Sequence, residues 1–182
     1  RAIDANHGGR YQLISRTPGR RGADLLATGA ATAIKGGRAL FGFFGTADGH
    51  LPFRTACGDF NPVGGRIEAG EPEELRKKYA PLTPYTEAEL TENPTLAEMT
   101  TTALEVLASR GPFWLMVEAG DVDWASHANN IDTAVGAVNS GDDAVAAPFA
   151  WIETHRGWDD PVVNVTADHG PMFVLDDPQE SA

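Results

Sequence analysis

Two short apolar runs, Phe113–Val117 and Val162–Thr166, are each followed within ten residues by acidic side chains and a histidine. Continuous apolar runs of this length are typical of strands that a sheet buries on both faces. An unpaired charge is costly at the end of a buried strand, so these side chains are expected to have a partner. The residues concerned are Glu118, Asp123 and His127 after the first run, and Asp168 and His169 after the second.

The beginning of the chain shows an alternation of strand and helix patterns. Tyr11–Ser15 and Ala39–Phe44 have the composition of strands, and Ala23–Ile34 between them has helical periodicity. A strand, helix and strand in this order are typical of parallel strands joined by a crossover. The pattern therefore predicts an α/β fold.

Two longer helices are predicted in the second half of the chain. Thr95 and Glu98 form the pattern of a capping box, in which each side chain satisfies a free backbone N–H at the helix start. A second helix is predicted over about Ile131–His155, interrupted or frayed near Gly141. With the apolar runs, these helices predict a three-layer α/β/α sandwich with a mostly parallel central sheet, incomplete in this chain.

Residues 1–182 are accordingly predicted to be part of a single α/β domain with a loop-rich insertion at about 45–93. The insertion is dense in glycine and proline and has little apolar periodicity, apart from a short helix pattern near Glu73–Tyr79. A long irregular segment inside a compact domain is usually functional, so we interpret it as an insertion rather than a linker.

Charge and cysteine content exclude several classes of function. The formal net charge of -12 disfavours a broad surface for nucleic acid or anionic membranes. No apolar stretch is long enough to span a membrane, and no signal peptide is recognisable in this chain. Cys57 is the single cysteine, so neither an internal disulfide nor a thiolate metal cluster is expected. Any metal ligands must come from Asp, Glu and His.

The spacing of the acids and histidines suits metal binding. Asp123 and His127 are four residues apart, which places them on one side of a helix. Asp168 and His169 are adjacent at a strand exit. Carboxylate oxygen and imidazole nitrogen suit Zn²⁺, and an oxygen-only site at Glu118 suits Mg²⁺. Spacing alone leaves the alternative of solvated or helix-capping pairs open.

Two sequence motifs resemble those of a known enzyme family. The run Val117–Ala128, V-E-A-G-D-V-D-W-A-S-H-A, resembles the first metal-binding signature of the alkaline phosphatase family, and Thr166–Gly170, T-A-D-H-G, resembles its second. The helix start at Thr95–Thr100, T-L-x-x-M-T, is also similar to the segment before the first motif. The resemblance extends over Asn93–Val174, and more loosely over Leu40–Pro52.

The resemblance implies a ligand set and an activity. Asp123 and His127 would bind one zinc, Asp168 and His169 a second zinc, and Glu118 one magnesium. The implied reaction is hydrolysis of phosphate monoesters through a phosphoserine, in which two cations clamp the oxygens of the transferring group. Relatives are commonly periplasmic or extracellular and often homodimeric. The resemblance implies the same location and a possible homodimer for this protein.

The chain also departs from the family pattern. The Asp-Ser-Ala type nucleophile motif does not occur, and Ser126 beside His127 fits an ordinary polar turn residue. We therefore expect the nucleophile upstream of residue 1, and we expect this chain to be an inactive internal fragment of a longer phosphatase. The alternatives are a truncated, non-catalytic metal-binding α/β module and a related hydrolase of the phosphodiesterase or sulfatase type.

Two further residues near the motifs bear on the implied metal sites. Trp124 stands where many relatives have Lys or His, and its indole carries no charge, which affects the magnesium site. His50 in the run G-H-L-P fits a family loop near the active site, but we favour a position on an exposed surface loop.

Overall fold

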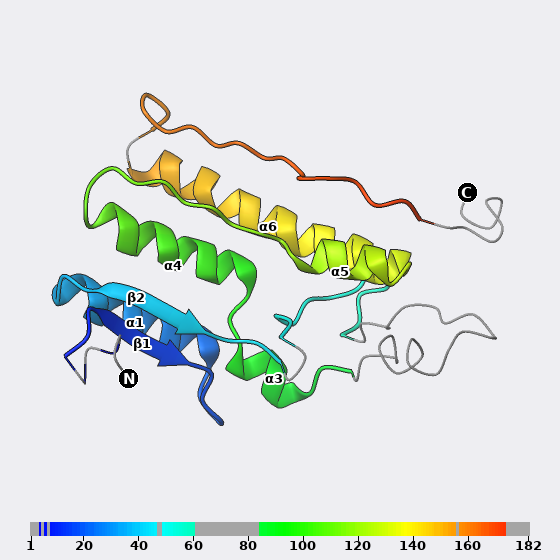
Figure 1. The fold of residues 1–182 in the computed structure, drawn as a ribbon, viewed down its shortest axis with the longest axis horizontal. Helices are drawn as coiled ribbons and strands as arrows, with labels where there is room; N and C mark the ends of the chain where they lie inside the picture. Colours follow the sequence, from blue (N-terminus) through cyan, green and yellow to red (C-terminus); the bar gives the residue numbers. More distant parts are fainter. Residues whose placement is uncertain are drawn as a thin grey trace.

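The computed structural model describes residues 4, 6, 8–46, 49–60, 84–155 and 157–173. The helix pattern near Glu73–Tyr79 lies outside this part of the chain. Figure 1 shows a small sheet and a stack of helices beside it. The elements are β1 (Tyr11–Ser15), α1 (Gly22–Lys35), β2 (Ala39–Phe43), α3 (Glu87–Glu92), α4 (Leu96–Ala108), α5 (Asp121–His127) and α6 (Ile131–His155).

The predicted strand, helix and strand at the beginning of the chain are confirmed. β1 and β2 are parallel, in a register that runs from Tyr11 opposite Ala39 to Ser15 opposite Phe43. α1 joins them and packs on both strands. The approach is close at Gly29, where an added Cβ would lie 2.6 Å from Cγ2 of Ile14. Glycine thus lets the helix backbone lie directly on the sheet.

The opposite face of this sheet is apolar and exposed. Side chains alternate between the two faces of a strand, so residues two apart share a face. Four large side chains are exposed on these strands at alternate positions, and they are Tyr11, Leu13, Phe41 and Phe43. Within the described residues the fold is mixed α/β with a two-stranded parallel sheet. The predicted three-layer sandwich is not confirmed.

The apolar runs Phe113–Val117 and Val162–Thr166 do not form the predicted strands. A strand requires a hydrogen-bonded neighbour, and neither run pairs with another segment that the structure describes. Their side chains are correspondingly exposed, with Trp114 at 80% and Val162 at 90% of full exposure. The continuous apolar character of these runs favours burial. A sheet forms, however, only where partner strands are present.

Capping boxes start both α3, which lies inside the predicted insertion, and α4, which follows it. The predicted box at α4 is confirmed, because Glu98 N–H donates to Thr95 Oγ1 (3.1 Å) and Thr95 N–H donates to Glu98 Oε2 (2.8 Å). α3 was not expected within the insertion. Its start has the same chemistry between Thr86 and Glu89, so the spacing T-x-x-E was a readable signal for this helix.

The predicted interruption of α6 near Gly141 is wrong. The helix continues through this glycine to His155. A Cβ added at Gly141 would lie 3.0 Å from the Cβ of Ala119, which belongs to the segment just before α5. The glycine therefore permits a close approach between α6 and that segment and does not break the helix.

Helix packing connects the sheet to the second half of the chain. α1 packs against α4, α4 packs against α6, and α6 packs against α5, in the order seen in Figure 1. Buried apolar residues of these helices include Leu26, Leu104, Val106, Ala137 and Ile152. None of the helices in the described ranges has the length and apolar character needed to cross a membrane.

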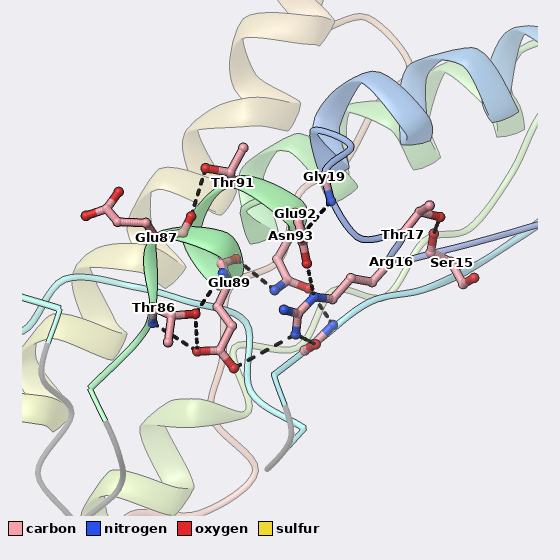
Figure 2. Close-up of polar contacts among 11 residues, drawn as sticks. Ser15, Arg16, Thr17, Gly19, Thr86, Glu87, Glu89, Thr91, Glu92 and Asn93 are labelled. Carbon is pink, nitrogen blue, oxygen red and sulfur yellow. Dashed lines mark hydrogen bonds and ion pairs between the residues drawn. The ribbon is translucent and has the colours of Figure 1, made fainter.

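A polar cluster joins the carboxyl ends of β1 and β2 to α3, and we call it the Glu92 cluster: Arg16, Gly19, Gly45, Glu92 and Asn93. Figure 2 labels Arg16, Gly19, Glu92 and Asn93 among its members. The Glu92 carboxylate accepts hydrogen bonds from Arg16 Nε (2.9 Å) and from Gly19 N–H (2.7 Å). Gly45 N–H donates to Asn93 Oδ1 (2.7 Å), and Gly45 C=O accepts from Arg16 Nη1 (3.2 Å). The cluster thereby fixes the turn that follows β2.

Glu92 is expected to make stability depend on acidic pH. Glu92 is 7% exposed. The hydrogen bond from Gly19 N–H has the largest effect on its carboxyl and the hydrogen bond from Arg16 the next largest, and both hold the pKa of Glu92 below its usual value of 4.5. A lowered native-state pKa stabilises the fold above the unfolded-state pKa, and this contribution is lost as the pH falls through the folded pKa. Glu92→Gln should therefore reduce stability at neutral pH and flatten its loss in acid.

Denaturant unfolding of the wild type and of Glu92→Gln, at neutral pH and below pH 4.5, measures this effect. The matched control is Glu87→Gln, which changes an exposed glutamate of the same helix and should leave the acid dependence close to that of the wild type. An equal acid dependence in the wild type and Glu92→Gln would contradict the assignment.

Candidate metal centre

The short helix α5 carries two of the predicted ligands on its outer side. Ala125 and Ser126 are buried on the helix that packs against α6. Asp123 and His127 are partly exposed, and Asp123 Oδ1 lies 3.5 Å from His127 Nε2. The spacing of four residues therefore places both side chains together, as helical geometry requires.

The second motif approaches the first. The segment after α6 runs back past that helix (Figure 1), and His169 Nε2 lies 3.7 Å from Asp123 Oδ1. Asp168 pairs with His169, at 3.5 Å between Asp168 Oδ2 and His169 Nε2, but its side chain is 90% exposed. Residues separated by an entire helix thus meet at one carboxylate oxygen.

Glu118 is not brought into this group. Glu118 is exposed in the segment before α5. Its carboxylate lies near the backbone of Gly120, where an added Cβ would be 3.5 Å from Glu118 Oε1. The structure therefore brings Asp123, His127 and His169 together, with Asp168 at the margin, and leaves Glu118 apart.

Asp123 Oδ1 lacks a hydrogen-bond partner among the described residues. It is buried and accepts no hydrogen bond from the described residues, because imidazole nitrogens at 3.5 and 3.7 Å are too distant for one. An unpartnered buried carboxylate oxygen is costly. Two ligands of one tetrahedral zinc lie about 3.3 Å apart when each bond is about 2.0 Å.

The oxygen and nitrogen donors therefore fit zinc in chemistry, and their pairwise separations are close to those that zinc requires. The arrangement is not a preassembled site, however. In the ranges that the structure covers, no group of three or more His, Cys, Asp or Glu side chains is placed to hold a metal ion.

His50 lies beside α5, and its predicted position on an exposed surface loop is wrong. Its side chain is 11% exposed, and its ring Nδ1 forms a hydrogen bond with Asp121 Oδ1. Its ring also meets the indole of Trp124 edge to face, with centroids 5.4 Å apart. The contact joins residues 71 positions apart, so only the likeness of its loop to a family segment pointed to this location.

Two potential nucleophiles in this region are unsuited to that role. Ser126 is buried within α5 rather than in the predicted turn, and its hydroxyl donates to Val122 C=O at 2.6 Å. Cys57 is exposed, but its hydrogen bond to the Asp132 carboxylate raises the pKa of the thiol. A raised pKa reduces the thiolate fraction and hence the reactivity.

Comparison with known proteins gives two findings. The model of the family described as "Alkaline phosphatase" matches residues 57–181, which include all five predicted ligands. A segment of 77 residues is 39% identical to "Alkaline phosphatase 3" of Bacillus subtilis (strain 168). This match covers 42% of the chain but only 16% of that relative's length.

Proposed function

The chain belongs to the alkaline phosphatase family, and from this premise we propose that it is part of a zinc- and magnesium-dependent phosphatase that hydrolyses phosphate monoesters through a phosphoserine. The observation that carries the proposal is the meeting of both motifs at one buried oxygen, where Asp123 Oδ1 faces His127 and His169.

The proposed ligand set follows the two motifs. Asp123 and His127 would hold one zinc, Asp168 and His169 a second, and Glu118 the magnesium. The contact between His169 and Asp123 supports neighbouring positions for the two zinc ions. When bound, zinc supplies Lewis-acid polarisation of the phosphoryl group and lowers the pKa of an oxygen nucleophile.

The side chains of this chain set the conditions for such binding. His127 and His169 must be neutral to offer Nε2 as a ligand, so metal binding should weaken in acid. The exposed indole of Trp124 adds an apolar surface next to Asp123 and contributes no charge. Ser126 is buried and uses its hydroxyl within α5, which makes it unsuited as the nucleophile. Because the Asp-Ser-Ala type motif does not occur in this chain, we propose a nucleophile upstream of residue 1.

The exposed apolar segments support the proposal that this chain is a fragment. Phe113–Val117 and Val162–Thr166 lack paired strands in the described part of the chain, and Phe41 and Phe43 lack a covering layer. We propose that further segments of the full-length protein pair with these runs and complete the three-layer sandwich. The isolated chain is accordingly expected to be inactive.

Hydrolysis of p-nitrophenyl phosphate by the full-length protein tests the proposed function. We expect turnover that a chelator abolishes and that added zinc restores, because the proposed ligands serve a metal-dependent reaction. A phosphate diester and a sulfate ester serve as comparison substrates and should react more slowly. Turnover that survives complete metal removal, or a preference for the diester or the sulfate, would contradict the proposal.

A further inference from the structure

The position of α5 depends on contacts from outside the helix. α5 spans seven residues, and its N-cap, Gly120, provides no side-chain hydrogen bond. An isolated helix this short is not stable in water, so tertiary contacts must fix it. Packing on α6 holds one side of α5. The side that carries Asp123 needs another support.

His50 provides contacts on that part of the helix. Because a carboxylate only accepts hydrogen bonds, we assign the proton to His50 Nδ1, which donates to Asp121 at the first residue of α5. The edge-to-face contact with Trp124 adds a second point of attachment one turn later. Asp121 and Trp124 lie on either side of Asp123 in the sequence, so the imidazole fixes the turn that presents this carboxylate.

The loop that carries His50 is itself held at its amino-terminal end. Thr46 N–H donates to His50 C=O at 2.8 Å, which closes the turn after β2. Gly45 in the same turn is bound by Arg16 and Asn93 of the Glu92 cluster. The backbone of His50 is therefore tied to the carboxyl ends of the parallel strands.

The other end of the loop is fixed on α6. Asp132, in the first turn of α6, accepts Ala56 N–H at its backbone carbonyl (3.0 Å) and Cys57 N–H at Oδ1 (2.8 Å). Gly136 lies against the loop so closely that an added Cβ would be 2.2 Å from Arg54 C=O. A loop anchored at both ends can hold His50 in one orientation.

We propose that His50 is a positioning residue, which fixes α5 through Asp121 and Trp124 so that Asp123 remains directed at the candidate metal centre. The inference rests on the proposed function, because it concerns the orientation of a proposed zinc ligand. Residues that orient metal ligands typically contribute 10–100-fold to metal affinity. His50 acts one step further from the ion, which places the expected effect near the lower limit.

Zinc affinity of the full-length protein, measured by competition with a chelator, tests this role. His50→Ala should weaken zinc binding by about tenfold. His50→Asn keeps an N–H donor close to the position of Nδ1 and should restore most of the affinity. In an Asp121→Ala background only the contact with Trp124 remains, so His50→Ala should cause a smaller loss there than in the wild type, since coupled residues are not additive.

The matched control for a loss of stability alone is Thr95→Ala. This variant removes the capping box of α4 and should lower the melting temperature without changing zinc affinity. Unchanged zinc affinity in His50→Ala, or an equal loss in Thr95→Ala, would overturn the inference while leaving the proposed function intact.

Hydrogen exchange separates the two proposals. If the wild-type protein binds no zinc, the proposed function fails, and amide exchange of residues 121–127 then decides the positioning role alone. Faster exchange of α5 in His50→Ala than in Thr95→Ala supports it. Equal exchange in α5 of the two variants overturns it.

Discussion

Replacement of Asp123 by alanine is expected to remove zinc from the first motif and to lower kcat/KM for phosphate monoesters by more than roughly a hundredfold. Oδ1 of this side chain is buried without a hydrogen-bond partner among the described residues, and it faces the imidazoles of His127 and His169. Outer-shell residues of metal sites already contribute 10–100-fold, and a direct ligand should contribute more. The measurement is metal content together with steady-state kinetics of the full-length variant.

The matched control is Asp142→Ala, which removes an exposed carboxylate of α6. It should retain the zinc content and the activity of the wild type. An Asp123→Ala protein with full zinc and full activity would show that the two motifs do not form the proposed metal centre.

Replacement of Gly136 by alanine is expected to have the largest effect on stability. An added Cβ would lie 2.2 Å from Arg54 C=O and 2.6 Å from Thr55 Cα. These are backbone atoms, so α6 and the loop must separate. Overpacking typically costs about 1–3 kcal/mol, and a clash with backbone belongs at the upper end. The better helix propensity of alanine offsets about 1 kcal/mol of this loss.

We therefore expect Gly136→Ala to lower the free energy of unfolding by roughly 2 kcal/mol, measured by denaturant titration of the full-length protein. Asn139→Ala, at an exposed position of the same helix, is the control and should be neutral or slightly stabilising. An unchanged or higher midpoint for Gly136→Ala would contradict the described packing between α6 and the loop.

Local patterns predicted the elements whose signals lie within a few residues. The bounds of β1 follow from a short apolar run, and the start of α4 follows from the Thr95 and Glu98 side chains. The same box at Thr86 and Glu89 is an equally local signal, which the glycine- and proline-rich composition of the insertion obscures. The runs at 113–117 and 162–166 were predicted as strands, but strand formation depends on partners elsewhere, which local sequence does not specify.

The candidate site was accessible from sequence in part. The spacing of Asp123 and His127 predicts a shared helix side. The resemblance to the two metal motifs of the family implies that the second motif lies near the first. The sequence does not predict the 3.7 Å approach of His169 Nε2 to Asp123 Oδ1, because this depends on the path of the chain around α6. Nor does it predict the role of His50, whose contact with α5 is long-range.

Anomalous scattering from a crystal of the full-length protein, measured at the zinc absorption edge, would locate the metal ions. We expect zinc bound by Asp123 and His127, with a second zinc close by at Asp168 and His169. A protein that is active on phosphate monoesters but carries no zinc at these four side chains would contradict this expectation.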